Sequence, residues 1–182
     1  MAWGQSPDST RKFRPIAVYP AFGFQPETSF QVGLVAVMVL KGRDQSQTSF
    51  ERQSTMNPFI LYTFKRQVLT EFPIDYFFRN GFNLNLAPRY FDFPDSFYGI
   101  GNDKDPDNFE TYTNQFWQLA GQLYIPVSEK TFVGAAIDVH YTRLKDFKEG
   151  GELENGTVNG INGGSLAGIG PALKYDTRDY AI

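Results

Sequence analysis

The chain has 182 residues, a net charge of −3 and no cysteine, so it has the size of one domain and contains neither a disulfide framework nor a thiolate metal site. Aromatic residues make up 16% of it, yet its mean hydropathy is −0.36. Its longest apolar run, residues 32–40, is much shorter than the roughly 18 residues of a membrane helix. The weak negative charge and the lack of a dense Lys/Arg cluster give no electrostatic basis for binding nucleic acid.

Alternating apolar and polar residues predict β-strands along most of the chain, because successive side chains of a strand point to opposite faces of a sheet. A polar tail, residues 1–14, precedes the first predicted strand, which begins near Pro15 and also holds Pro20. Since a proline cannot donate a ladder hydrogen bond, this strand is predicted to lie at a sheet edge or a weakly paired seam. Further strands are predicted at residues 30–40 and 55–64.

The clearest alternation lies in residues 67–92, where apolar side chains such as Phe72 and Leu84 take one face and polar ones the other. The Asn80-Gly81 pair between the two halves predicts a tight hairpin turn, because both central residues of that turn favour positive φ. These two strands exceed the roughly five or six residues usual in soluble proteins and match the nine to eleven or so that a tilted strand needs to cross a bilayer.

Beyond this hairpin, a segment rich in Pro, Gly, Asp and Asn predicts a long loop at residues 93–110. Strands follow at residues 113–125 and 132–142, then a second loop at 148–164 and a last strand at 167–176. No segment has helical periodicity. The predicted fold is therefore all-β: an antiparallel up-and-down meander of about eight long strands over residues 15–182, forming a transmembrane β-barrel or the first half of a larger one.

Two further patterns fit such a barrel. Aromatic residues near strand ends suit the girdles at membrane interfaces, at Tyr62, Phe64, Phe78, Phe82, Tyr90, Tyr124, Tyr141 and Tyr175. Charged and titratable residues on the polar faces predict a network that lines the lumen and its rim, at Glu71, Asp75, Arg89, Asp138, His140, Lys174, Asp176, Arg178 and Asp179.

Asp138 and His140 lie two residues apart on one predicted face, which makes them candidates for a catalytic site. Nucleophilic catalysis needs a serine within hydrogen-bond reach of the histidine, and the alternation places the nearest one, Ser165, on the apolar side. We therefore interpret His140 as a polar residue of the lumen and predict no catalytic residue. The aspartates at residues 103, 105 and 107 are interpreted as a solvated acidic loop rather than a calcium site, so no metal or cofactor is predicted.

Four stretches, in their order and spacing, resemble the barrel of the BamA/TamA family of outer-membrane assembly and translocation proteins, also called the bacterial surface antigen family. They are GFQPETSFQVG at 23–33, FPDSFYGIGND at 93–103, FKEGG at 147–151 and YDTRD at 175–179. The resemblance covers about residues 15–179. Family barrels have sixteen strands, so it implies that this chain is the N-terminal half of one.

The resemblance implies a location in the bacterial outer membrane and insertion or translocation of outer-membrane proteins through a lateral seam, without covalent chemistry. Its implied partners are lipopolysaccharide and phospholipid, unfolded outer-membrane protein clients and assembly-complex subunits. No signal peptide is recognisable at Met1, so an exported form is expected to have lost its leader. The resemblance places one side of the seam on the first strand, at Ile16, Val18, Tyr19, Pro20 and Phe22.

Two other functions remain open. One is a small outer-membrane enzyme of the acyltransferase or phospholipase kind, which would act on lipid through His140. The other is a soluble barrel that binds a ligand on an inward apolar face.

Overall fold

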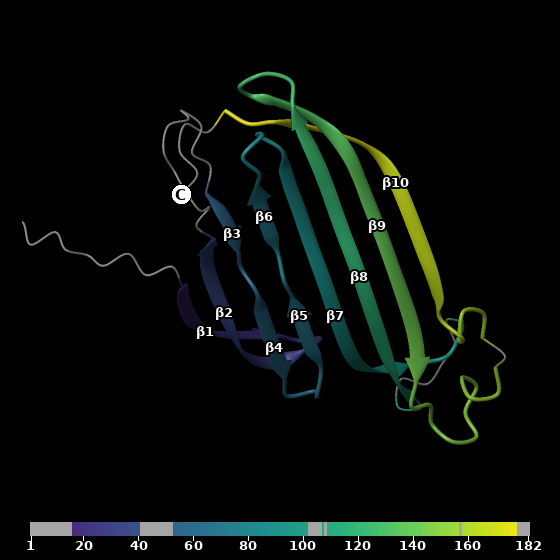
Figure 1. Ribbon diagram of the computed structural model, residues 1–182. Helices are drawn as coiled ribbons and strands as arrows, with labels where there is room; N and C mark the ends of the chain where they lie inside the picture. The colour runs from purple at the N-terminus through teal and green to yellow at the C-terminus, as the bar shows by residue number, and fades with distance from the viewer. Residues whose placement is uncertain (1–15, 41–52, 102–106, 108, 157, 178–182) are drawn as a thin grey trace, which may run out of the picture.

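The computed structural model describes residues 16–40, 53–101, 107, 109–156 and 158–177. These residues form an all-β structure, a curved antiparallel sheet of ten strands (Figure 1). The predicted antiparallel meander is confirmed. The strands are β1 (Ile16–Gln25), β2 (Ser29–Leu40), β3 (Ser54–Met56), β4 (Phe59–Thr63), β5 (Val68–Glu71), β6 (Ile74–Phe77), β7 (Asn83–Phe97), β8 (Glu110–Pro126), β9 (Thr131–Lys145) and β10 (Gly164–Tyr175).

The structure has ten strands where the alternation predicts about eight, because two predicted strands are each interrupted at a proline. Pro58 separates β3 from β4, and Pro73 separates β5 from β6. A proline has no N–H group, so each gap is a place where the ladder lacks a donor. The proline carbonyls still accept bonds of 2.9 Å, from the backbone N–H of Ala36 to Pro58 and from that of Asn57 to Pro73.

The strand register continues unchanged across both gaps. Met56 pairs with Ile74 on one side of the gaps, and Phe59 pairs with Glu71 on the other, which is the register of a single uninterrupted pair of strands. Consecutive segments therefore lie side by side in chain order from β1 to β10, with β3 and β4 sharing one position and β5 and β6 the next.

The predicted loop at residues 93–110 is wrong at both ends, because β7 continues through Phe97 and β8 begins at Glu110. Pro94 does not break β7. The carbonyl of Pro88 accepts a 3.0 Å bond from Phe72, so alternation turns Pro94 toward the β5 side as well. No residue of β5 lies opposite Pro94, so its missing N–H group costs no hydrogen bond with β5. Because its nitrogen points away from β8, it costs none with β8 either.

The connections divide between the two ends of the sheet because consecutive strands are antiparallel. The turns at 26–28 and 64–66 and the longer connections at 98–109 and 146–163 lie at one end, which we call the loop end. The turns at 78–82 and 127–130 lie at the opposite end. At the loop end, Lys65 Nζ donates to the carbonyls of Pro26 and Glu27, at 3.1 and 2.9 Å, and so ties two turns together.

The register separates the side chains into two faces. One face takes the even-numbered residues of β1–β7 and the odd-numbered residues of β8–β10, and we call it the apolar face. The other is concave, because its side chains converge: Lys174 of β10 reaches Asn83 of β7 at 3.0 Å although β9 and β8 lie between them. The apolar face is therefore the convex one.

Candidate functional site

Large apolar side chains are exposed on the convex face. Phe22 is 79% exposed and Ile169 is 83% exposed, although both sit in regular strands. Within the strands, the large apolar residues that are similarly exposed on the concave face are few: Tyr19, Val37 and Leu166. Solvent-exposed apolar patches of this extent mark surfaces that contact an apolar partner or a membrane.

Polar side chains, by contrast, are buried on the concave face. Asn83 and Thr63 have no exposed surface and are the largest side chains buried to that degree. Thr63 Oγ1 is 3.0 Å from Gln67 Oε1, to which it donates, and Gln67 Nε2 donates to the Pro94 carbonyl at 3.3 Å. The usual burial of a soluble sheet is thus inverted, since polar groups are enclosed and apolar groups face outward.

A first polar chain crosses four strands of the concave face. Glu71 and Arg89 form an ion pair of 3.0 Å between β5 and β7. Arg89 donates to Gln118 of β8 at 3.3 Å, and Gln118 Nε2 lies 2.8 Å from both carboxylate oxygens of Asp138 on β9. Three of the predicted network residues, Glu71, Arg89 and Asp138, are thus joined through Gln118, which the sequence reading did not include.

A second polar chain lies nearer the opposite end of the sheet. Asp75 accepts hydrogen bonds from the side-chain amides of Asn83 and Asn85, the latter at 2.8 Å. Asn83 Oδ1 in turn accepts the 3.0 Å bond from Lys174. The ammonium of Lys174 also lies 5.6 Å from the ring centroid of Tyr124. Asp75 and Lys174 were predicted members of the network; the asparagines that link them were not.

The remaining predicted network residues fall in different places. His140 lies on the concave face with its ring 5.4 Å from that of Phe116. Ser165 lies on the opposite face, because it pairs with Tyr141 rather than His140, so the structure does not bring this serine to the histidine. Asp176 is buried just beyond β10. Arg178 and Asp179 lie outside the described residues.

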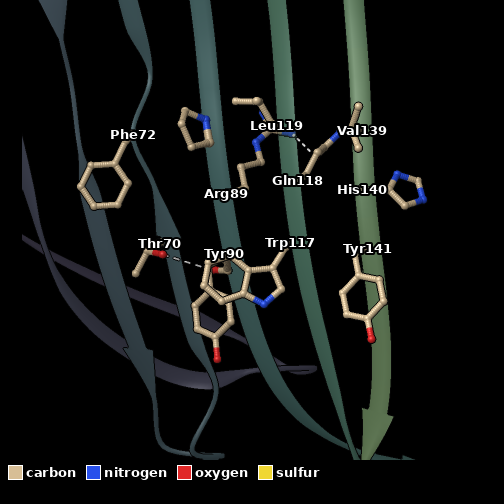
Figure 2. A pocket seen from close by; sticks show the side chains of 11 residues that line it. Thr70, Phe72, Arg89, Tyr90, Trp117, Gln118, Leu119, Val139, His140 and Tyr141 are labelled. Carbon is tan, nitrogen blue, oxygen red and sulfur yellow. Dashed lines mark hydrogen bonds between the residues drawn. The ribbon is translucent and has the colours of Figure 1, made fainter. Parts of the chain in front are cut away.

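Aromatic side chains form a row on the apolar face toward the loop end. The register aligns Tyr90, Trp117 and Tyr141 on β7, β8 and β9, and Figure 2 shows the hydroxyls of both tyrosines directed toward the C-terminal end of β9. The rings of Tyr90 and Trp117 have centroids 4.2 Å apart. The sequence analysis predicts Tyr90 and Tyr141 as girdle residues but not Trp117. Its alignment with the two tyrosines depends on the register, which the sequence alone does not give.

One of the residues predicted for the girdle does not lie on the apolar face. Tyr124 lies on the concave face and is buried, because β8 follows β7 with opposite parity and its even-numbered residues turn inward. The concave face also holds an unpredicted aromatic cluster, in which the rings of Phe91 and Phe116 stack at 5.5 Å and Phe93 lies 6.0 Å from Phe91. The concave face is therefore mixed, with polar chains and one aromatic cluster.

The predicted seam strand is an edge strand. In the described part of the chain, β1 pairs with β2 alone and β10 with β9 alone. Ile16, Val18, Pro20 and Phe22 lie on the apolar face and Tyr19 on the concave one, and all five are exposed.

Each edge strand carries a proline whose nitrogen faces the free edge. The backbone N–H of Ala36 points toward β4, where it donates to Pro58, so the backbone groups of the odd-numbered residues of β2 point toward β1. Val35 is one of these residues and pairs with Tyr19, so the nitrogen of the next residue, Pro20, points away from β2. At the other edge, the N–H of Asp176 donates to Lys130 at 2.8 Å, which turns Pro171 outward in the same way. Prolines placed so remove donors from the free edges without weakening the sheet.

The loop end is held together by carboxylates. Glu110 accepts the backbone N–H groups of Glu152 at 2.6 Å and Leu153 at 3.0 Å, which fastens the 146–163 connection to the start of β8. Asp95 of β7 and Tyr112 of β8, which are register partners, are also joined by a side-chain hydrogen bond.

No cluster of three or more potential metal-ligating side chains occurs among the described residues. Asp107 lies among them, whereas the aspartates at 103 and 105 lie outside them. The described residues also include no helix that is long and apolar enough to cross a membrane. Comparison of the chain with family models, curated proteins and solved structures found no match.

Proposed function

We propose that this sheet is the wall of an outer-membrane β-barrel, whose convex face contacts acyl chains and whose concave face lines a hydrated lumen. The observation that carries the proposal is the inverted burial, with Phe22 and Ile169 largely exposed while Asn83 is enclosed. A soluble barrel turns its apolar face inward, whereas a transmembrane barrel turns it outward. The aromatic row of Tyr90, Trp117 and Tyr141 supports the same reading as an interfacial girdle.

Within this class we propose a BamA/TamA-like role, the insertion or translocation of outer-membrane proteins at a lateral seam formed by β1. An edge strand offers a row of backbone groups with which an incoming β-strand can pair. One feature of β1 supports this role: among the described strands it has β2 as its neighbour on one side only, so its other backbone edge is free apart from the one donor that Pro20 lacks. The step is mechanical and requires no covalent chemistry.

The proposed partners follow from these surfaces. Lipopolysaccharide and phospholipid would contact the convex face, and an unfolded outer-membrane protein client or an assembly-complex subunit would contact β1. The enzymatic alternative gains no support from Ser165, which lies across the sheet from His140. The soluble alternative would require the exposed apolar face to be covered by something other than lipid.

Photo-cross-linking tests the proposed seam with two matched positions. Val18 on β1 and Val139 on β9 are both exposed valines of the apolar face, but only Val18 lies on an edge strand. With benzoylphenylalanine at one position or the other, the protein is reconstituted in phospholipid vesicles and mixed with an unfolded outer-membrane protein. We expect client adducts at Val18 and few at Val139. Equal yields at the two positions, or none at Val18, would contradict the seam.

A further inference from the structure

The apolar face carries a groove of about 550 Å³ over β5, β7, β8 and β9 (Figure 2). Two neighbouring rows of apolar-face side chains make up most of its lining, and Arg89, Gln118 and His140 complete it. The row nearer the loop end is Thr70, Tyr90, Trp117 and Tyr141, and the next row runs from Phe72 through Pro88 and Leu119 to Val139. In the second row the compact ring of Pro88 lies between the larger side chains of Phe72 and Leu119.

A polar row follows immediately beyond the aromatic row. Asp92, Gln115 and Arg143 are aligned by the register on β7, β8 and β9, two residues beyond Tyr90, Trp117 and Tyr141. On β7, β8 and β9 the apolar surface therefore ends at the aromatic row and is replaced by charged and amide side chains. Such a boundary suits a ligand with an apolar part and a polar part.

The charges of this polar row are unequally satisfied. Asp92 is held by Lys145 at 3.2 Å, by Gln115 at 3.1 Å and by the Tyr90 hydroxyl at 3.1 Å, so its carboxylate is neutralised within the protein. Arg143 is exposed and makes no hydrogen bond or ion pair with another described residue. Its guanidinium is thus free to bind an anion two residues beyond Tyr141, which lines the groove.

We infer that the groove binds a phosphorylated lipid, with an acyl chain along Pro88 and Leu119 and a phosphate on Arg143. A guanidinium binds phosphate through two parallel N–H···O bonds, and the adjoining aromatic row suits the boundary between acyl chains and headgroups. The inference rests on the proposed function, because it assumes that this face contacts lipid.

The position of Arg143 indicates which lipid. It lies at the loop end, together with the connection 146–163, the longest between consecutive strands of the sheet. In outer-membrane barrels the longer loops face the cell exterior, where the leaflet consists of lipopolysaccharide. The proposed ligand is therefore the lipid A part of lipopolysaccharide, bound through one of its phosphates.

Tryptophan quenching tests this inference. The chain has two tryptophans, so Trp3→Phe leaves Trp117, which lines the groove, as the single fluorophore. The protein is reconstituted in vesicles of brominated phosphatidylcholine, which quenches an indole that it touches. Diphosphoryl lipid A, which carries no bromine, is then added. We expect it to relieve the quenching by displacing the brominated lipid from the groove.

Four comparisons decide the outcome. Arg143→Gln should weaken the relief about tenfold or more, since it removes a charge-assisted pair, and Arg143→Lys should restore part of it. Lys148→Gln, which removes one positive charge from the same end, should leave it unchanged. Dephosphorylated lipid A should relieve the quenching of the protein that retains Arg143 as weakly as intact lipid A relieves the quenching of the Arg143→Gln variant.

The outcomes also separate the inference from the proposed function. No quenching of Trp117 by brominated lipid would overturn both. If lipid A relieves the quenching equally in the Arg143→Gln variant, the inference is overturned, but the proposal that this face contacts lipid still stands. Equal relief by phosphatidylglycerol would overturn the assignment to lipid A. A variant that fails to fold is recognised by loss of the strand circular dichroism signal, and Arg143→Lys then carries the test.

Discussion

Lys174 on the last strand donates a hydrogen bond of 3.0 Å to Asn83 on β7, across two intervening strands. This contact requires a strongly curved sheet and joins the β10 edge to the middle of the wall. Asn83 also donates to Asp75, so the lysine completes a chain that satisfies a fully buried amide. The same contact fixes the sense of curvature, which places the apolar side chains on the convex side.

Replacing Lys174 by methionine should loosen the β10 edge. The substitution leaves the side-chain oxygen of Asn83 buried without its donor, at a cost of about 1–3 kcal/mol. Hydrogen exchange of the β10 amides should accelerate more than that of β8. Lys148→Met, in the exposed 146–163 connection, is the matched control and should leave both unchanged. Uniform acceleration across the sheet would argue against a local role.

The ion pair between Glu71 and Arg89 should show measurable but modest coupling. A double-mutant cycle of Glu71→Gln and Arg89→Gln, followed by urea unfolding, should give an interaction free energy of about 1 kcal/mol, because the Arg89 side chain is partly exposed. Adding Gln118→Ala should reduce this energy, since Gln118 orients the guanidinium. An additive cycle would mean that the pair forms without stabilising the sheet.

Gly134 should not tolerate a side chain. A Cβ at this position would overlap the carbonyl oxygen of Leu123 on the neighbouring strand, so Gly134→Ala should destabilise the protein by about 1–3 kcal/mol. Gly168 lies on the same concave face one strand farther on, and a Cβ there would meet its nearest atom, the Asp138 carbonyl oxygen, at 3.9 Å. Gly168→Ala should therefore be neutral in the same unfolding experiment, and equal losses would contradict the close approach at Gly134.

Glu110 should control access to the 146–163 connection. Glu110→Ala removes the acceptor for two backbone N–H groups, which should raise the population of the open connection about tenfold. Limited trypsin cleavage after Lys148 should accelerate accordingly. Glu129→Ala, in the turn at the other end of the sheet, serves as the control. Unchanged cleavage in Glu110→Ala would show that other contacts hold the connection.

Much of the architecture could be predicted because the period-two alternation reports strand and face directly. It assigned Phe72 and Leu84 to one face of the sheet, and the structure agrees. Proline effects were harder to predict, because the cost of a proline depends on the side to which its nitrogen points. Pro94 faces a side where no strand remains and is tolerated, whereas Pro73 faces a partner and interrupts β5 and β6.

The candidate site was less predictable, because its contacts depend on register and curvature. Charged residues such as Glu71 and Lys174 were recognised, but not the amides of Gln118 and Asn83 that connect them across strands. Neutral amides carry no sequence signal that separates a network member from a surface residue. The groove beside Trp117 was missed for a related reason, since it arises from two rows on four strands.

The central claim is that the convex face contacts lipid, and site-directed spin labelling tests it most directly. The chain has no cysteine, so single cysteines can be introduced from residue 117 to residue 123 of β8 without background labelling. In phospholipid vesicles, labels at odd positions such as Leu119 should collide with oxygen, which concentrates in the acyl region. Labels at even positions such as Ala120 should collide instead with a water-soluble nickel reagent. Odd-position labels that are immobile and shielded from oxygen, as in a dry protein interior, would contradict the claim.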